Sequence, residues 1–280
     1  MTGQLYVVAT PIGNLQDITL RALDVLKAVD AVAAEDTRHS QGLLAHYGIR
    51  KPLLALHEHN ERQASSKVLG QIQAGQSVAL ITDAGTPGIS DPGAILVEQA
   101  HAAGIRVVPV PGPSAVVAAL SAAGLLNGRF LFHGFLPSKA GARRTELESL
   151  REQSANLVFY EAPHRVLETV ADMAELLGQR TLVVARELTK TFETIQRLPL
   201  SEALSWLQED ANRQRGAFVL IVSGAPAVQE EALSAATLKV LQILLTELPV
   251  KQASKLAAEI TGEKKNRLYE AALQLRASPS

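Results

Sequence analysis

The 280-residue chain contains no cysteine. This absence excludes a disulfide framework, a thiolate zinc site and a cysteine nucleophile, and it fits a reducing compartment. Long apolar runs are missing too: no stretch approaches about 18 consecutive apolar residues, so no membrane-spanning helix is expected. Residues 1–8 show no basic region followed by an apolar run, so no signal peptide is expected either. We therefore expect a soluble, cytoplasmic protein.

The chain also has few aromatic residues and a small net charge. Only 4% of the residues are aromatic, whereas 47% are hydrophobic and 20% are charged. The core must therefore consist mostly of Ala, Leu, Val and Ile, which suits buried parallel strands covered by Ala-rich helices. Because the net charge is only −1, the molecule as a whole does not attract polyanions. A nucleic acid would have to meet a local basic patch.

Short apolar runs alternate with helical patterns along the first two thirds of the chain, which predicts α/β structure with a parallel first sheet. The first part has expected strands at 5–9, 31–34, 78–81 and 106–110, and helices at 18–29, 66–74 and 94–103. The second part has expected strands at 130–132, 156–160, 181–185 and 217–222, and helices at 143–152, 165–177 and 201–209. A helix at 115–123 is expected to bridge the two parts.

These patterns divide the chain into domains. We predict two α/β domains, at 1–115 and 116–225, followed by a linker at 226–236 and a small helical domain at 237–280. The region of the linker is rich in Gly, Pro, Gln and Glu and has no strong periodicity. In the tail, Pro249 interrupts the helical pattern and Gly262 is suited to end a helix.

Three loops rich in Gly and Pro follow predicted strands, at 10–14, 83–93 and 109–115. Gly permits positive φ and a close approach of backbone to ligand, and Pro stiffens a loop. Because open α/β sheets bind ligands at the carboxyl ends of their strands, the loops predict a cleft. None contains a Walker A or GxGxxG motif. On composition alone, tight turns that merely connect elements are an equally good interpretation.

The order of the motifs identifies a family. The runs TPIGNL (10–15), DAGTP (83–87) with DPG (91–93), and PGPSA (111–115) resemble the three signatures of the tetrapyrrole-methylase superfamily. Five further runs resemble its branch of small-subunit ribosomal RNA 2′-O-methyltransferases: AEDTR (34–38), HEHNE (57–61), GFLP (134–137), FYEAPHR (159–165) and RELTK (186–190). The resemblance runs from residue 5 to about 222, and the helical tail is similar to that branch's C-terminal domain.

The resemblance implies two α/β/α domains with a cleft for S-adenosylmethionine between them. It also implies a homodimer whose substrate is 16S ribosomal RNA, in free form or in the small subunit, methylated on the 2′-hydroxyl of the decoding-centre cytidine 1402. By motif match, the residues implied to contact the cofactor are Pro11, Asp83, Ala84, Gly85, Thr86, Ile89, Ser114, Ala115, Phe135, Tyr160 and Glu161.

Two acidic residues are candidates for catalysis. Asp36 directly follows a predicted strand, so it is expected at the same sheet edge as the loops, with Glu35 as its partner. The alternative, of equal weight, is that Asp36 caps a helix or pairs with Arg38. No metal site is expected, because His57 and His59 lack a convincingly spaced third ligand.

Basic and polar residues provide candidates for RNA contact. Residues 138–144 are predicted to form a mobile basic flap, and 264–267 a basic patch in a tail that carries seven Lys/Arg against four Asp/Glu from residue 237 onward. The alternatives are structural ion pairs and a solvated helix face. The candidates are Asn14, Arg38, His57, His59, Asn60, Lys139, Arg143, Arg144, Arg165, Arg186, Lys190, Lys264, Lys265 and Arg267.

Two competing functions stay open at this stage. A small-molecule methylase of the tetrapyrrole type would have a closed apolar substrate cavity and no need of a basic tail. A non-catalytic RNA- or nucleotide-binding module would bind S-adenosylmethionine unproductively or not at all.

Overall fold

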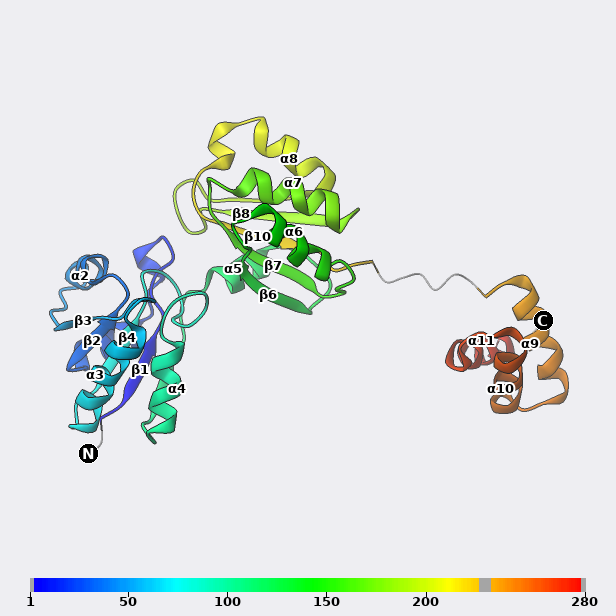
Figure 1. Cartoon of the computed structure of the whole chain (residues 1–280), viewed down its shortest axis with the longest axis horizontal. Coiled ribbons are helices and arrows are strands. Elements are labelled where there is room, and N and C mark those ends of the chain that lie inside the picture. The colour runs from blue at the N-terminus through cyan, green and yellow to red at the C-terminus, as the bar shows by residue number, and fades with distance from the viewer. Residues whose placement is uncertain (1–2, 227–232, 278–280) are drawn as a thin grey trace. The chain divides into compact units, whose positions relative to one another are not determined.

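The computed structural model describes residues 3–226 and 233–277 (Figure 1). The chain divides into two compact units, Met1–Ala225 and Pro226–Ser280. The larger unit contains two five-stranded sheets, and the described part of the smaller unit is helical. Among the described residues, no helix is both long and apolar enough to cross a membrane.

The first sheet has the strand order β3-β2-β4-β1-β5. Its strands are β1 (Leu5–Val8), β2 (Ala31–Ala34), β3 (Leu53–Ala55), β4 (Val78–Ile81) and β5 (Val107–Val110). All neighbouring pairs are parallel, as predicted. Every residue of β2 and β4 is buried, as expected for inner strands covered on both faces. The carboxyl ends of all five strands therefore lie at one edge, where the Gly/Pro-rich loops begin.

Helices cover both faces of this sheet. They are α1 (Leu20–Ala28), α2 (Thr37–His46), α3 (Glu61–Gln73) and α4 (Ala94–Ala102), with a short 3-10 helix η1 (Leu15–Asp17) before α1. Leu26 of α1 and Leu44 of α2 pack on one face, and Ile72 of α3 and Leu96 of α4 pack on the other. Helix α2 and the three-residue edge strand β3 were not predicted, because neither carries a strong apolar period.

The second sheet has the strand order β6-β7-β10-β8-β9. Its strands are β6 (Phe130–Phe135), β7 (Asn156–Glu161), β8 (Thr181–Arg186), β9 (Thr194–Pro199) and β10 (Phe218–Val222). This sheet is mixed: β6 and β7 are parallel, whereas β10 is antiparallel to β7 and β8, and β9 is antiparallel to β8. A loop of seven residues, 187–193, joins β8 to β9, and a link this short suits an antiparallel pair. Strand β9 was not predicted, because it is a half-exposed edge strand.

Helices also flank the second sheet. They are α5 (Ala115–Ala122), α6 (Ala140–Ser149), α7 (Val166–Leu177) and α8 (Leu200–Gln208), followed by the 3-10 helix η2 (Ala211–Gln214). Helices α6, α7 and α8 pack against Phe159 and Leu220 on one face, and α5 packs against Val158 and Ile221 on the other. The predicted loop-like flap at 138–144 is wrong: residues 140–144 form the start of α6, which packs on α7 through Leu147.

The described part of the C-terminal unit is a cluster of three helices with its own core. Its helices are α9 (Ala235–Glu247), α10 (Val250–Thr261) and α11 (Lys265–Ala277). Leu241, Ala257 and Leu268 are fully buried at their contact. Pro249 precedes α10, and Gly262 ends it in the left-handed conformation, as its position in the sequence indicates. Helix α9 begins at Ala235 and so overlaps the last two residues of the predicted linker at 226–236. Residues 227–232 of that linker lie outside the described residues.

Candidate active site

The three Gly/Pro-rich loops meet at the carboxyl edge of the first sheet. The backbones of Thr10 and Gly85 bond to each other in both directions, at 2.9 and 3.0 Å. The hydroxyl of Thr86 donates to the carbonyl of Pro113 at 3.0 Å. Gly85 has a φ of 86°, a conformation that favours glycine. The loops therefore form one hydrogen-bonded structure and are not merely independent turns.

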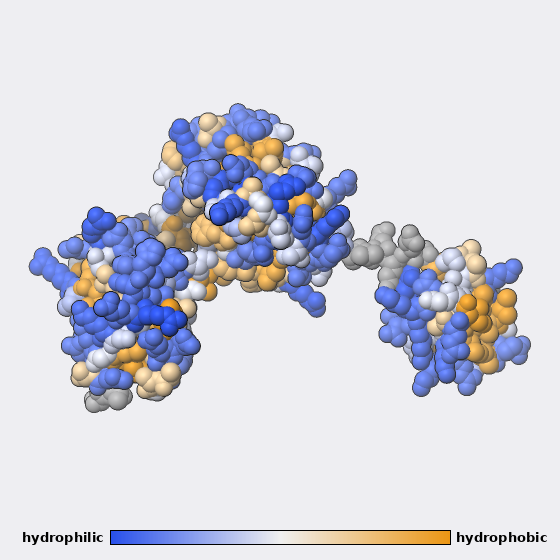
Figure 2. Space-filling model, in the orientation of Figure 1, coloured by the Kyte–Doolittle hydropathy of each residue, from blue (hydrophilic) through white to orange (hydrophobic). Residues whose placement is uncertain are grey.

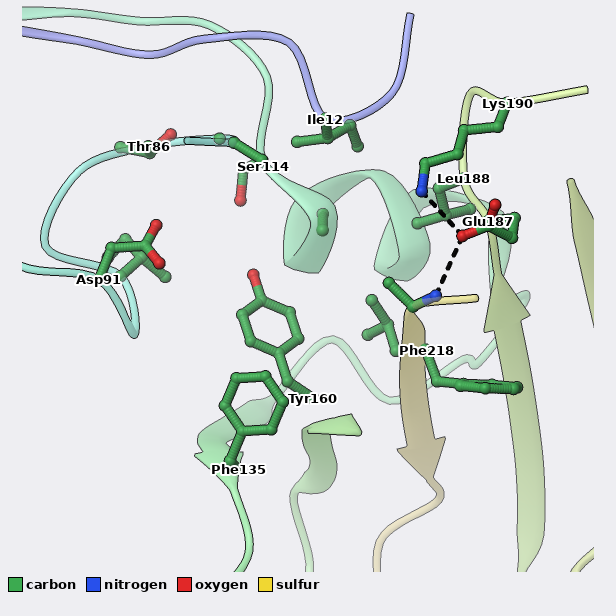
Figure 3. Close-up of a pocket in the computed structure, with 16 residues that line it drawn as sticks. Ile12, Thr86, Asp91, Ser114, Phe135, Tyr160, Glu187, Leu188, Lys190 and Phe218 are labelled. Carbon is green, nitrogen blue, oxygen red and sulfur yellow. Dashed lines mark hydrogen bonds and ion pairs between the residues drawn. The ribbon is translucent and has the colours of Figure 1, made fainter. Parts of the chain in front are cut away.

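A cavity lies between these loops and the second sheet (Figure 3). The first part of the chain contributes Ile12, Ala84, Gly85, Thr86, Ile89, Asp91, Ser114 and Ala115, and the second contributes Phe135, Tyr160, Glu187, Leu188, Lys190, Ala217, Phe218 and Val219. Figure 3 shows polar oxygens of Asp91, Ser114 and Tyr160 at one end, and Ile12, Leu188 and Phe218 toward the other. The Glu187–Lys190 ion pair lies beside Leu188. The site thus combines apolar surface with a few polar and charged groups, as pockets for small ligands do.

Eight of the eleven residues implied to contact a cofactor line this cavity. They are Ala84, Gly85, Thr86, Ile89, Ser114, Ala115, Phe135 and Tyr160. Pro11, Asp83 and Glu161 are not among the lining residues. Pro11 is buried next to the lining residue Ile12, and Asp83 accepts a hydrogen bond from the backbone N–H of Asp36 at 3.1 Å.

Glu161 has a structural role in the second sheet. Its side chain is buried and accepts hydrogen bonds from the Thr169 hydroxyl at 2.5 Å and from the N–H of Ala162 at 2.8 Å. It also pairs with Arg165 at 3.4 Å. A buried carboxylate needs such partners. The adjacent Tyr160 faces the cavity because successive strand residues point to opposite faces.

Sequence reasoning missed several lining residues. Asp91 stands in a loop that the motifs had already singled out, so its position could have been inferred. Ala217, Phe218 and Val219 lie at the start of β10 and belong to no motif. Only the antiparallel placement of β10 between β7 and β8 brings them to the cavity, and that pairing is invisible to local pattern analysis.

The loop after β8 is strained where it lines the cavity. Glu187 and Thr189 have φ values of 51° and 66°, which are costly for residues with a side chain. The carboxylate of Glu187 accepts hydrogen bonds from the Lys190 ammonium at 2.8 Å and from the N–H of Ala217 at 3.0 Å. Although burial opposes it, these groups lower the pKa of Glu187. They hold the strained loop in place and keep this carboxylate ionised.

The two acidic residues expected to act in catalysis, Glu35 and Asp36, are not among the residues that line the cavity. Asp36 is the N-cap of α2, where its carboxylate accepts from the N–H groups of Arg38 and His39, and it also pairs with Arg38 at 3.5 Å. The hydrogen bond from Arg38 is the main cause of its lowered pKa. Glu35 accepts a hydrogen bond from the N–H of Asp83, and burial raises its pKa. The capping and ion-pair alternative for Asp36 is confirmed.

Arg143 and Arg144, expected in a mobile flap, are tied to α7. Only 3% of the Arg143 side chain is exposed, and its Nε donates to Asp172 at 2.6 Å. Arg144 pairs with Asp172 at 2.9 Å and with Glu175 at 2.5 Å. These ion pairs fix α6 on α7. They occupy both guanidinium groups within the domain, and the burial of Arg143 leaves it no surface for RNA.

Two further arginines expected to contact RNA support loops instead. Arg165 donates to the carbonyls of Leu136 and Pro137, at 2.7 and 3.2 Å. Arg186 is buried and donates to the carbonyls of Arg215 and Phe192. Such bonds satisfy loop carbonyls that would otherwise be orphaned.

Lys190, also expected to contact RNA, instead lines the cavity and pairs with Glu187. The remaining candidates of the larger unit lie nearer its surface. Asn60 orders its own loop by accepting from the N–H of His57 and donating to the carbonyl of Ala55. The rings of His57 and His59 lie 6.1 Å apart in edge contact. Asn14 caps η1. Arg38, His57, His59 and Lys139 are exposed.

In the C-terminal unit, the basic patch lies at the start of α11. Lys264 and Lys265 are exposed, whereas Arg267 pairs with Glu263 at 2.9 Å. The two lysines therefore present the clearest positive charge at this end of the helix.

The fold and the loops together define a methylase of the tetrapyrrole type. The family described as Tetrapyrrole (Corrin/Porphyrin) Methylases matches residues 4–204, and the RsmI C-terminal HTH domain matches residues 231–276. The chain belongs to the tetrapyrrole methylase family and, within it, to the ribosomal RNA small subunit methyltransferase I group.

Curated relatives of that group match this chain over nearly its whole length. The ribosomal RNA small subunit methyltransferase I of Pseudomonas aeruginosa is 58% identical, with 97% of each chain covered. The protein of that name from Escherichia coli O157:H7 is 55% identical, covering 97% of this chain and 95% of its own.

Solved structures agree on the fold. The methyltransferase CobJ is 19% identical, covers 80% of this chain and 95% of its own, and superposes with a TM-score of 0.61. Uroporphyrin-III C-methyltransferase from Thermus thermophilus, solved in complex with S-adenosylhomocysteine, is 18% identical, covers 79% and 97%, and has a TM-score of 0.56. The predicted fold class is confirmed.

Proposed function

We propose that this protein transfers a methyl group from S-adenosylmethionine to the ribose 2′-hydroxyl of cytidine 1402 in 16S ribosomal RNA, and that it does so in the cytoplasm as a homodimer. The observation that carries the proposal is the 58% identity to a ribosomal RNA small subunit methyltransferase over 97% of both chains. The cavity at the carboxyl edge of the first sheet supports it.

The lining of the cavity fits S-adenosylmethionine. Ile12, Leu188 and Val219 offer apolar surface for an adenine ring, and the backbone groups of loop 83–93 can hydrogen-bond the polar ends of the molecule. A Cβ on Gly85 would meet Ile12 and Pro113 at ordinary contact distances of 3.5 and 3.9 Å, so it is the positive φ of 86° that favours glycine in this wall. When bound, the cofactor supplies an activated methyl group, which is the difficult part of the chemistry.

The protein's own task is then to orient the acceptor. The 2′-oxygen, the methyl carbon and the sulfur must be in line, and such alignment accounts for several kcal/mol of a barrier. RNA read at a 2′-hydroxyl must expose its nucleotide. The exposed cations Arg38 and Lys139 of the larger unit and Lys264 and Lys265 of the tail are suited to hold the flanking phosphates.

The test is incubation of the purified protein with radiolabelled S-adenosylmethionine and either free 16S RNA or small subunits from cells lacking the enzyme. We expect label in one of the two RNAs and none in RNA whose target nucleotide is 2′-deoxy. Label in the 2′-deoxy RNA would disprove the 2′-oxygen as acceptor. No transfer to either substrate would disprove the proposal, and transfer to a tetrapyrrole would favour the small-molecule alternative.

A further inference from the structure

A second hollow lies on the first sheet, between helix α2 and the edge strand β3, which contact each other (Figure 1). We call it the α2–β3 groove. Its volume of about 710 Å³ is large enough for a ligand of several functional groups. Its lining residues are Thr37, Gln41, Leu44, Ala45, Ile49, Arg50, Lys51, Leu53 and Ala55. None of these residues lines the cavity of the candidate active site, so the groove is a separate feature of the surface.

The shape of the groove follows from the two elements that form it. Residues 37, 41, 44 and 45 recur at helical spacing and so share one face of α2. Leu53 and Ala55 share one face of β3, whereas Leu54 between them packs on the opposite face of the sheet. Because β3 is the outer strand of the sheet order, no further strand fills the space beside it.

Two cations give the groove its charge. Arg50 and Lys51 lie in the segment between α2 and β3, and neither forms an ion pair or a side-chain hydrogen bond with another residue that the structure describes. None of the described lining residues is acidic. Arg143 and Arg165 of the second sheet, by contrast, are held by a carboxylate and by loop carbonyls. The charges of Arg50 and Lys51 are therefore available to an anionic ligand.

One end of the groove is joined to the loop that lines the cavity. Thr37 directly follows Asp36, whose backbone N–H donates to the carboxylate of Asp83 at 3.1 Å. Asp83 in turn precedes Ala84 and Gly85, which line the cavity. Strand β2 alone separates β3 from β4, which places these two strands about 10 Å apart. A ligand longer than one nucleotide could therefore extend from the groove along the carboxyl edge of the sheet toward the cavity.

The chemistry of the groove fits a single-stranded nucleic acid. Cations neutralise phosphates, the hydroxyl of Thr37 and the amide of Gln41 can hydrogen-bond ribose or base edges, and Ile49 and Leu53 offer apolar surface to a base. A peptide strand added to the edge fits less well. Pro52 lacks a backbone donor at the start of β3, and a strand of three residues is too short to template much pairing.

We propose that the α2–β3 groove holds the RNA strand that flanks the target nucleotide, with Arg50 and Lys51 on its phosphates; this inference rests on the proposed function. A strand bound there leads along the carboxyl edge of the sheet to the cavity, where the target ribose must be exposed. The two cations act at a distance from the reacting atoms. Their contribution is to the affinity for RNA and to the direction in which the strand enters the site.

The test replaces both cations, Arg50→Ala with Lys51→Ala, in the full chain. The matched control, Lys27→Ala with Arg106→Ala, removes two exposed cations next to the amino ends of β2 and β5, at the opposite edge of the sheet. Filter binding measures affinity for whichever substrate the wild type methylates, 16S RNA or the small subunit. At physiological salt we expect the affinity to fall about tenfold. The slope of log affinity against log salt should decrease by about 1.4, since each phosphate contact to a single strand contributes about 0.7. The control should match the wild type.

Kinetics and stability separate an RNA contact from a structural role. KM for RNA should rise about tenfold with kcat within about twofold of wild type, because only binding of the flanking strand is lost. The affinity for S-adenosylmethionine and the thermal unfolding temperature should be unchanged. Wild-type RNA affinity and KM in the double variant would overturn the proposal. Self-association of that variant with unchanged RNA affinity would also overturn it, since the cations would then only protect the edge of β3. No methyl transfer by the wild type itself would instead refute the proposed function.

The absence of cysteine from the chain permits a second experiment. Ala45→Cys introduces a unique thiol into the groove, and Glu98→Cys introduces one on α4, at an exposed position of a helix that covers the other face of the sheet. Each thiol is labelled with a photoreactive maleimide and irradiated in the presence of the RNA substrate. We expect Ala45→Cys to cross-link to nucleotides next to the target, and Glu98→Cys not to. Cross-links of Ala45→Cys only to another protein chain would show that the groove is a protein contact and would overturn the proposal.

Discussion

At the scale of single residues, the site depends both on a glycine in its wall and on which side chains of strand β7 face the cavity. Gly85 supports the cavity wall through a backbone conformation that other residues adopt only at a cost. Tyr160 and Glu161 are neighbours in β7, yet one lines the cavity and the other is buried in the domain. Motif similarity identifies both residues, but only the alternation of the strand separates their roles.

Substitution Gly85→Val tests the role of glycine in the cavity wall. Valine at this φ should lower the free energy of unfolding by about 1–2 kcal/mol. It should also weaken S-adenosylmethionine binding at least tenfold, because its two methyl groups would extend beyond the Cβ from a residue that lines the cavity. Gly88→Val is the matched control: its φ of 80° imposes the same strain, but a Cβ there meets open space, and Gly88 does not line the cavity. Denaturant titration and calorimetry measure the two effects. Equal affinity in the two variants would remove Gly85 from the binding site.

At the scale of elements, loops are positioned by residues that never reach the cavity. Helix α3 holds the start of α4 through Glu61, and α6 is held on α7 by Arg143 and Arg144. The same ion pairs explain why the basic run at 138–144 is not a flap. A basic run in a loop-like sequence suggests exposure, but acidic residues of another helix can bind it in the folded chain. Here those residues are Asp172 and Glu175, about 30 residues away along the chain.

Replacing Glu61 tests whether this anchoring matters for binding. Glu61→Ala leaves two buried N–H groups without an acceptor, so we expect a loss of about 2–3 kcal/mol of stability together with weaker binding of S-adenosylmethionine. Glu61→Gln keeps one acceptor oxygen, so its loss of stability should be about half that of Glu61→Ala. Thermal unfolding with and without cofactor gives both quantities. If Glu61→Ala binds the cofactor as tightly as wild type at a temperature where both are folded, loop 83–93 does not depend on this contact.

At the scale of the whole molecule, the two units each have their own core. The larger unit contains the cavity and all of its lining residues. The smaller unit buries Leu241 and Leu268 within its three helices and carries exposed lysines at the start of α11. It also exposes apolar side chains, such as those of Ile243 and Ile260, and Figure 2 shows apolar residues gathered on its visible face. The cavity and the exposed lysines of the tail therefore belong to units that each have their own core.

Deletion of residues 226–280 tests this division. The shortened protein should unfold cooperatively and bind S-adenosylmethionine with wild-type affinity, but RNA methylation should fall at least tenfold at physiological salt. In the full chain, Lys264→Ala together with Lys265→Ala should weaken RNA binding and reduce the slope of log affinity against log salt by about two, because two phosphate contacts are lost. A shortened protein that methylates RNA as well as wild type would show that the tail does not hold the substrate.

The strongly periodic parts of this protein could be predicted from sequence alone. Buried strands such as β4 and amphipathic helices such as α7 follow from local apolar patterns, and the three loops follow from their Gly and Pro content. Weakly patterned elements at the edges, such as β3 and β9, could not be predicted, because a half-exposed strand has little apolar signal.

The sequence by itself determined the α/β class, the sheet edge where the loops gather and, through motif order, the family. Only the tertiary structure decided which polar groups face the cavity. Asp36 and Asp91 both sit in polar segments after strands, yet Asp36 caps α2 whereas Asp91 lines the cavity. The physical reason is that a carboxylate's role depends on its partners. Those partners, such as Glu61 for loop 83–93, come from elements that are distant in sequence and meet only in the folded chain.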